Sequence, residues 1–352
     1  MTMTFATIHD LETPSVLIDL DLMEANIGVM QSRCDALGIA FRPHIKTHKI
    51  PDIARRQLEA GAKGIACQKV SEAEVFADAG FDDIQIPYNI VGARKTRRLA
   101  ELAKSAKVTV TVDSQPVIDG IAAAAQAVDS TIHMMVELVS LGQRTGTTPA
   151  AALALAKQIQ ATDNLNFAGL MIYPSDAAIR PRLLETLALL EAAGIPVATV
   201  SGGGSGAISD MRLLPELTEM RVGTCIFWDW NSVSADYAGF DNCAMRVRAS
   251  VVSANEPDRV ILDSGSKSIQ SETIDEQFGY IAEHPAARLY KVNEEHGYVD
   301  FSACGFTPSV GDIVHIIPVH TCVVTNLHNQ LYGVRGDTIE VVWEVAARGL
   351  VW

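Results

Sequence analysis

Residues 41–49 read Phe-Arg-Pro-His-Ile-Lys-Thr-His-Lys and follow the apolar run 37–40. An apolar run that ends in a basic cluster is typical of a buried strand that delivers its charged side chains to one end of a sheet. A lysine held there among cations, partly out of water, is less stable as an ammonium and more nucleophilic as an amine. Such a lysine can form a Schiff base with a carbonyl cofactor. A solvated basic loop is the alternative that this stretch alone leaves open.

Short apolar segments and amphipathic segments alternate after this stretch. We expect strands over 39–44, 64–68, 83–88, 108–113, 132–138, 167–173, 197–201 and 220–228. We expect helices over 21–37, 50–60, 71–79, 92–104, 115–127, 148–161 and 178–193. Strands that alternate with helices indicate a parallel sheet, and eight strands are the number that closes a (β/α)8 barrel. An open doubly wound sheet is the alternative, but we find no G-x-G-x-x-G fingerprint to support it.

The composition and the periodicity of the sequence change near residue 240. Residues 244–352 are rich in Val, Ile and Thr with period-2 alternation, and turn-forming residues recur between the runs. This pattern predicts an antiparallel β domain. We therefore expect a barrel domain over 1–240 and a β domain over 241–352. The early apolar run 15–19 is expected to be a strand that pairs with the β domain.

Composition limits the classes of protein to which the chain can belong. Its 352 residues, 48% hydrophobic and 20% charged, indicate a folded globular protein. The net charge of −14 argues against nucleic-acid binding. Six cysteines without paired spacing argue against a disulfide framework and for a reducing compartment. With no signal-peptide pattern and no apolar run of about 18 residues, we expect a cytoplasmic protein.

Polar residues follow the expected strands, at the end where a barrel carries its chemistry. They are His44, Lys46, Gln68, Tyr88, Asn89, Asp113, Glu137, Tyr173, 201–206 and 221–224. Residues 201–206 read Ser-Gly-Gly-Gly-Ser-Gly, so their backbone N–H groups can approach and hold a phosphate. A flexible linker is the alternative, although linkers seldom lie between two barrel strands. Residues 221–224 add donors on the adjacent loop. A lysine together with a phosphate cradle is what pyridoxal phosphate requires.

A second candidate site lies in the β-rich part, where residues 318–322 read Pro-Val-His-Thr-Cys. We expect a strand there, on which residues two apart share a face, so that His320 and Cys322 can bind one cation. Two protein ligands leave positions for water or substrate, which suits a catalytic metal. The alternative, which spacing alone favours slightly, is a buried cysteine beside a hydrogen-bonded histidine without any metal.

Several stretches together resemble the D-threonine aldolase and D-serine dehydratase family. They are 42–49, 67–74, 201–206, 293–297 and the segments from His320 through Trp343 to 348–349. The resemblance extends over nearly the whole chain. It implies an alanine-racemase-like barrel of the pyridoxal-phosphate fold type III, followed by an antiparallel β domain. It also implies pyridoxal phosphate and a divalent metal, Mn²⁺ or Zn²⁺, as cofactors, and a homodimer with its sites near the interface.

The resemblance also implies roles for single residues. Lys46 is similar to the Schiff-base lysine, with His44 and Tyr173 as further catalytic residues. The residues implied in cofactor binding are Lys46, Gln68, Arg144, Tyr173, Gly203, Gly204, Ser205, Arg221, Gly223 and Thr224. Arg221 matches a position that faces the pyridine nitrogen in related racemases, and His320 and Cys322 match the metal pair. One position departs from the family, because residues 137–146 lack the expected aspartate after Glu137.

The function that the resemblance implies is a lyase that acts on β-hydroxy-D-amino acids. We expect retro-aldol cleavage of D-threonine to glycine and acetaldehyde, with a small D-amino acid as substrate and neither nucleic acid nor membrane as partner. A D-serine or 3-hydroxy-D-aspartate dehydratase that uses the same lysine and metal is the close alternative. A non-catalytic carrier of pyridoxal phosphate is a third, but a carrier needs neither the β domain nor the metal pair.

Overall fold

The structure, a computed structural model, describes residues 6–140, 142 and 144–352. It divides into two compact units that interleave along the chain. The barrel unit comprises Met30–Lys46, Ile53–Gly223 and Leu350–Trp352. The β unit comprises the described residues up to Val29, Thr47–Asp52 and Thr224–Gly349. The sequence places one boundary after residue 240, whereas in the structure residues 224–240 belong to the β unit.

An eight-stranded parallel sheet forms the centre of the barrel unit. Its strands are β2 (Ala40–Phe41), β3 (Ile65–Ala66), β4 (Asp83–Ile86), β5 (Lys107–Val112), β6 (Ile132–Leu138), β7 (Leu165–Ile172), β8 (Thr199–Gly203) and β9 (Glu219–Arg221). Neighbouring strands follow the order β2-β9-β8-β7-β6-β5-β4-β3. The ring closes between β2 and β3, because His44 pairs with Ala66 and the amide of Lys63 donates to the carbonyl of Phe41 at 2.8 Å. The predicted eight-stranded barrel is therefore confirmed.

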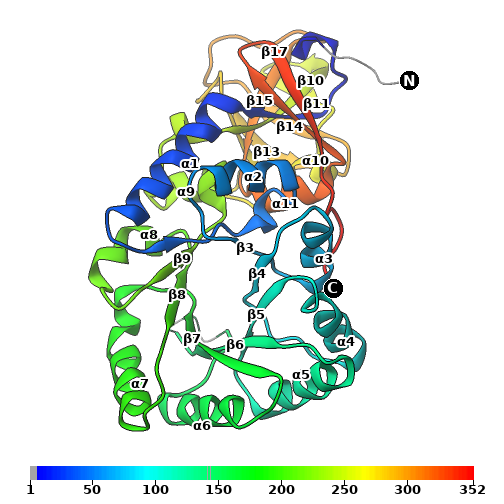
Figure 1. Ribbon diagram of the computed structural model, residues 1–352. Helices are drawn as coiled ribbons and strands as arrows, with labels where there is room; N and C mark the ends of the chain where they lie inside the picture. The colour runs from blue at the N-terminus through cyan, green and yellow to red at the C-terminus, as the bar shows by residue number, and fades with distance from the viewer. Residues whose placement is uncertain (1–5, 141, 143) are drawn as a thin grey trace. The chain divides into compact units, whose positions relative to one another are not determined.

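Helices alternate with these strands along the chain. They are α1 (Leu20–Asp35), α2 (Pro51–Glu59), α3 (Val70–Asp78), α4 (Ala93–Leu102), α5 (Gln115–Val128), α6 (Pro149–Gln160), α7 (Arg180–Ala192) and α8 (Ala207–Asp210). Figure 1 shows α3 to α7 around the outside of the strands. Strands covered on both faces read as nearly continuous apolar runs. Strand β6 is an example, since all of its residues except half-buried His133 are buried. This burial is why the strands were recognisable in the sequence.

Several predicted strands are shorter in the structure, and at two of them a 3-10 turn follows the strand. The strand expected over 39–44 ends at Phe41, and Ile45–Thr47 forms a single turn of 3-10 helix, so that Lys46 lies on this turn. Pro43 lies between them and has no amide hydrogen to donate to a ladder. The strand expected over 220–228 ends at Arg221, and Thr224–Ile226 is again a 3-10 turn. Periodicity alone does not separate a short buried strand from a buried turn.

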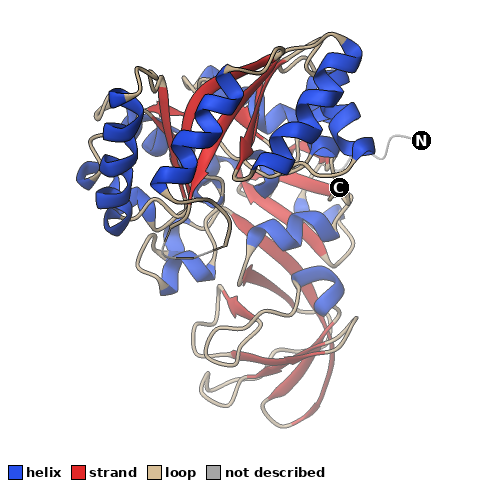
Figure 2. Cartoon of the chain, turned by 90° about the horizontal axis from the view of Figure 1, so that it is seen from below, coloured by secondary structure: helices blue, strands red, loops and turns tan. Residues whose placement is uncertain are grey.

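The β unit is built on a nine-stranded sheet. Its strands are β1 (Ser15–Asp19), β10 (Met245–Glu256), β11 (Arg259–Leu262), β12 (Gly279–Ile281), β13 (Arg288–Val292), β14 (Gly297–Asp300), β15 (Ile313–Pro318), β16 (Gln330–Arg335) and β17 (Thr338–Glu344). Strand β1 pairs antiparallel with β10 and parallel with β16. Three short helices, α9 (Trp230–Ser234), α10 (Ser266–Ile269) and α11 (Thr321–Leu327), complete the unit. Figure 2 distinguishes its strands, in red, from its helices, in blue.

No helix within the described ranges is long and apolar enough to span a membrane.

Candidate active site

Lys46 lies on the 3-10 turn that follows β2, with two polar neighbours from the barrel unit. The amide of Lys46 donates to Nδ1 of His44 at 3.5 Å, and Nε2 of His44 lies 3.1 Å from Oε1 of Gln68. Both contacts fit one tautomer of His44, with its proton on Nε2. The ammonium of Lys46 has no hydrogen bond or ion pair to any residue that the structure describes. The structure thus brings His44, Lys46 and Gln68 together, with the lysine side chain available for a ligand.

The glycine-rich loop begins at the end of β8. Gly204 has a φ of +107°, which side-chain-bearing residues rarely adopt, and a Cβ there would lie 3.4 Å from the Cβ of Pro174. A Cβ on Gly203 would lie 2.8 Å from the carbonyl of Arg221. The amides of Gly204, Ser205 and Gly206 find no acceptor within the described part of the chain. Three successive amides without an acceptor among the described residues are the donor set that a phosphate needs, so the residues present fit that group.

Tyr173 follows β7 and contacts Arg144. The guanidinium carbon of Arg144 lies 4.3 Å from the centroid of the Tyr173 ring, which is cation–π geometry. The hydroxyl of Ser140 donates to the carbonyl of Tyr173 at 2.6 Å, in the segment where the family's aspartate is missing. The structure therefore brings Arg144 and Tyr173 together. Leu141 and Gln143, in the same segment, lie outside the described residues.

Arg221 ends β9 inside the barrel and is almost fully buried, with 3% of its surface exposed. Burial lowers the pKa of Arg221 to about 10, against the attraction of Glu219 and Glu137. Its Nε donates to Oγ of Ser201 at 2.7 Å. The roles of Ser201 and Glu219 beside this arginine were not predictable, because nothing in the spacing of 201 and 219 indicates that the two residues meet.

Gly223 and Thr224 stand at the junction of the two units. Gly223 follows Val222, whose carbonyl accepts a hydrogen bond from the amide of His44 at 2.9 Å. Gly223 thus belongs to the chain segment beside Lys46. Thr224 begins the next 3-10 turn, and its carbonyl accepts from the amide of Phe227 at 3.0 Å. A role of Thr224 in phosphate binding stays a prediction.

His320 and Cys322 do not lie on a strand, contrary to the prediction. Strand β15 ends at Pro318, His320 is the residue before α11, and Cys322 lies in the first turn of that helix. The side chains converge nevertheless. Burial disfavours the imidazolium of His320, but hydrogen bonds to Asp229 and Cys322 outweigh it and raise the pKa of His320 to about 11. The imidazole of His320 therefore lies between the carboxylate of Asp229 and the sulfur of Cys322.

Asp229 completes this arrangement and was missed by the sequence analysis. Its Oδ2 lies 2.8 Å from Nδ1 of His320, so Nε2 is the nitrogen left to face a cation. The thiol of Cys322 donates to Oγ1 of Thr47 at 3.3 Å. Among the described residues, no group of three or more His, Cys, Asp and Glu side chains forms a complete metal site. The chemistry of the pair fits a cation with two protein ligands and further ligands from water or substrate.

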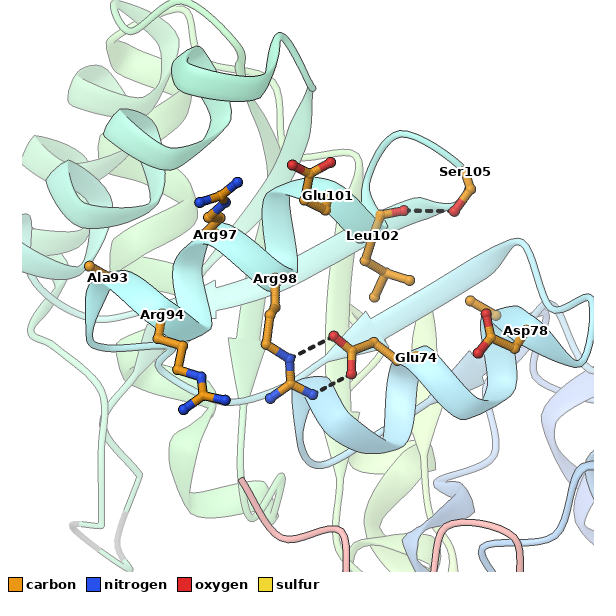
Figure 3. A pocket seen from close by; sticks show the side chains of 10 residues that line it. Glu74, Asp78, Ala93, Arg94, Arg97, Arg98, Glu101, Leu102 and Ser105 are labelled. Carbon is orange, nitrogen blue, oxygen red and sulfur yellow. Dashed lines mark hydrogen bonds and ion pairs between the residues drawn. The ribbon is translucent and has the colours of Figure 1, made fainter.

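A separate groove of about 970 Å³ lies on the outside of the barrel, between α3 and α4 (Figure 3). Three arginines and three carboxylates line it, so its charges balance. Nε of Arg98 donates to Glu74 at 2.8 Å across the groove. None of the residues of the candidate active site lines this groove.

Comparison with known proteins agrees with the architecture described above. The family described as alanine racemase, N-terminal domain, matches residues 18–229, and the putative serine dehydratase domain matches residues 244–334. The chain is 37% identical to a D-threonine aldolase from Arthrobacter, over 96% of this chain and 93% of that protein. It is 31% identical to a 3-hydroxy-D-aspartate aldolase from Paracoccus denitrificans, over 97% of this chain and 93% of that protein.

A solved structure extends this likeness to the fold. The crystal structure of D-threonine aldolase from Filomicrobium marinum matches with a TM-score of 0.93 and 31% sequence identity, over 99% of this chain and all of that chain. The two domain families match successive parts of the chain, and the structural match covers 99% of it. The chain therefore belongs to the alanine-racemase-like family of D-threonine aldolases and D-serine dehydratases.

Proposed function

We propose that the protein is a lyase, dependent on pyridoxal phosphate and a divalent metal, that cleaves D-threonine to glycine and acetaldehyde. The observation that carries the proposal is the arrangement of Asp229, His320 and Cys322. A lysine and a glycine loop suit any pyridoxal-phosphate protein with this barrel, including a racemase or a carrier. A cation site is needed only where the substrate carries a group that a cation must activate, such as a β-hydroxyl. The names of the aldolase relatives support the same assignment.

In the barrel unit, Lys46 would hold the cofactor through its amine, and the amides of Gly204, Ser205 and Gly206 would hold its phosphate. Gln68, Tyr173, Arg144 and Arg221 are proposed to surround the ring, and Gly223 and Thr224 to add phosphate contacts. Pyridoxal phosphate supplies, when bound, a conjugated ring that accepts the electron pair of a broken bond at Cα.

In the β unit, His320 and Cys322 would hold the cation, with Asp229 fixing the ring of His320. A divalent cation supplies, when bound, a positive charge that lowers the pKa of a hydroxyl group. A thiolate and an imidazole suit Zn²⁺, whereas Mn²⁺ prefers harder oxygen ligands.

The overall reaction sets what the chain's own residues must do. A proton leaves the β-hydroxyl, the Cα–Cβ bond breaks, Cβ becomes the aldehyde carbon of acetaldehyde, and a proton returns to Cα to give glycine. We propose His44, Lys46 and Tyr173 as the groups for these proton transfers. His44 is the best oriented of them, because its hydrogen bond with Gln68 fixes its ring.

Product analysis tests this proposal. The purified protein, supplied with pyridoxal phosphate and Mn²⁺ or Zn²⁺, is incubated with D-threonine, L-threonine and D-serine. We expect acetaldehyde and glycine in equal amounts from D-threonine and no product from L-threonine. Ammonia and a keto acid from D-serine, without acetaldehyde from D-threonine, would identify a dehydratase. Chelation should abolish cleavage but leave the visible absorption of the bound cofactor, because Lys46 and the glycine loop contain no metal ligand.

A homodimer and a cytoplasmic location also stay proposals. The support for both is the resemblance to the family and the composition of the chain. Sedimentation of the purified protein tests the first, and fractionation of the source cells tests the second.

A further inference from the structure

A series of buried hydrogen bonds connects Arg221 through Ser201 and Glu219 to Arg42. Oγ of Ser201 lies 2.7 Å from Nε of Arg221 and 2.7 Å from Oε1 of Glu219. Oε2 of Glu219 accepts from Nε of Arg42 at 2.8 Å. None of these four residues is more than 5% exposed. Buried charged groups without such partners would be strongly destabilising, so the network accounts for how Arg221 remains inside the barrel.

The register of two strands produces this arrangement. In the pairing of β8 with β9, Ser201 lies opposite Glu219 and Gly203 opposite Arg221. Residues two apart on a strand share a face, so all four positions point to the same side of the sheet. Gly203 has no side chain, and a Cβ there would lie 3.4 Å from Nη2 of Arg221. The guanidinium therefore occupies the space that a larger residue at position 203 would fill.

Hydrogen-bond chemistry fixes the direction of each proton. Nε of an arginine only donates and a carboxylate only accepts, so the hydroxyl of Ser201 accepts from Arg221 and donates to Glu219. Nη2 of Arg221 donates to the carbonyls of Ile172 at 3.3 Å and of Ser201 at 3.4 Å. Nη1 has no partner within the described part of the chain. Two nitrogens are thus fixed by the protein, and one is left for a ligand.

Arg42 has a second carboxylate partner. Its Nη1 pairs with Oδ1 of Asp83 at 2.8 Å, and the other oxygen of Asp83 lies 3.5 Å from Nζ of Lys107. Gly64 makes room for Arg42, because a Cβ on Gly64 would lie 2.5 Å from Nη1 of Arg42. The carboxylate of Glu219 is therefore shared between Arg42 directly and Arg221 through Ser201.

We propose that Glu219 is a positioning residue that acts through Ser201. It keeps the guanidinium of Arg221 charged and fixes its orientation, so that Nη1 is the nitrogen without a partner among the described residues. The inference rests on the proposed function only in naming the cofactor ring as the group that Nη1 meets. A guanidinium held in this way can only donate, so it disfavours a proton on the ring nitrogen that it faces. The network thereby sets how strongly the bound ring withdraws electrons, although neither Glu219 nor Ser201 touches it.

The first test needs no cofactor. The Nε–H signal of Arg221 is followed by nuclear magnetic resonance in the full-length protein freed of any bound cofactor, and is assigned by its loss in Arg221→Lys. We expect slow exchange with water in the wild type. Exchange should be about 10- to 100-fold faster in Ser201→Ala and Glu219→Gln, the change expected when a hydrogen bond to a charged group is lost. Unchanged exchange in both folded variants would overturn the proposal.

Glu216→Gln is the matched control. Glu216 accepts from Nε of Arg180 at 3.1 Å, on the outside of the same barrel. The substitution is chemically the same and also removes the charged partner of an arginine. We expect it to leave the Arg221 signal unchanged and to alter only that of Arg180. An equal change at Arg221 would mean that any lost carboxylate loosens the barrel, and would also overturn the proposal.

The second test uses the protein loaded with pyridoxal phosphate. We expect Glu219→Gln and Ser201→Ala to shift the visible absorption band and its pH dependence, and to lower kcat more than they raise KM. A purely structural role would lower the melting temperature and leave the spectrum unchanged, which would overturn the proposal. If the wild type takes up no pyridoxal phosphate while the exchange rates change as expected, the proposed function fails and the positioning of Arg221 by Glu219 stands.

Discussion

Nδ1 of His320 lies 2.8 Å from Oδ2 of Asp229, a side chain without exposure to solvent. The same carboxylate accepts from the amide of Thr321 at 3.2 Å, and from the amide and hydroxyl of Ser232 at 2.9 and 2.6 Å. Four hydrogen bonds fix its orientation. A buried carboxylate that holds one ring nitrogen of a histidine directs the other nitrogen outward as a metal ligand and raises its basicity.

Asp229→Asn is expected to weaken divalent-metal binding by roughly 10- to 100-fold, the usual effect of removing such an outer partner of a metal-binding histidine. The reason is that the side-chain amide of asparagine carries no charge. Only its oxygen accepts hydrogen bonds, whereas both oxygens of a carboxylate accept them. Titration of the metal-free protein with Zn²⁺, followed by calorimetry, measures the change. Asp236→Asn, an exposed aspartate in the same unit, is the control and should leave the affinity unchanged. Equal Zn²⁺ affinities of the wild type and Asp229→Asn would contradict the proposal that His320 is a metal ligand.

Lys46 is expected to be the residue that carries the cofactor. Borohydride treatment of the loaded protein, followed by mass spectrometry of its peptides, should find pyridoxal phosphate on the peptide that contains Lys46. Lys46→Ala should lose both the label and the visible absorption. Lys69→Arg is the control, because Lys69 Nζ lies 3.7 Å from the centroid of the Tyr88 ring and is already engaged. A label on Lys49 or Lys69 would contradict the assignment.

Gly204→Ala is expected to weaken the binding of pyridoxal phosphate by about tenfold or more. An alanine at a φ of +107° is strained by about 1–3 kcal/mol, and the loop would relax away from the geometry that presents its amides. Fluorescence titration with pyridoxal phosphate measures the effect. Gly120→Ala makes the same chemical change in α5, where nothing lies within 4 Å of the added Cβ. The control should gain up to about 1 kcal/mol of stability from helix propensity and keep its affinity.

Glu137→Gln is expected to stabilise the protein at pH 7 and not at acid pH. Burial raises the pKa of Glu137 above its ordinary value of 4.5, against a hydrogen bond from Thr145 and the charge of Arg144. A carboxyl group with a raised folded-state pKa contributes stability that is complete below pH 4.5 and is lost as the pH rises through that raised value. Glutamine keeps the acceptor for Thr145 Oγ1, which lies 2.8 Å from Oε1 of Glu137, and has no charge to bury.

Thermal unfolding of both proteins from pH 4 to pH 8 checks this prediction. The melting temperature of the variant should exceed that of the wild type by a margin that grows with pH. Glu101→Gln, on the exposed side of α4, is the control and should show no such trend. A variant that is less stable than the wild type at pH 7 would show that the carboxylate of Glu137 is stabilised in the fold.

The sequence alone determined the barrel and indicated candidate residues for a cofactor site. Helices alternate with strands β2 to β9 along the chain, and most of these strands, such as β6, are buried and read locally as short apolar runs. Lys46 and the loop 201–206 could be proposed as cofactor-binding residues because both patterns depend on residue types within a few positions of one another. The wrong prediction of a strand at His320 and Cys322 has the same cause, because it too rested on a short local pattern. Whether His320 and Cys322 lie on a strand or on a helix depends on packing that a five-residue pattern does not contain.

Only the tertiary structure decided which distant side chains hold these residues in place. Asp229 and His320 are 91 positions apart, and Arg42 and Glu219 are 177 positions apart. No periodicity spans such distances. The expected pairing of β1 with the β unit is confirmed, but only the folded chain shows that its neighbours are β10 and β16, more than two hundred residues later. Local patterns reflect the burial of neighbouring residues, whereas the orientation of a functional side chain depends on groups that only the folded chain brings within hydrogen-bond distance.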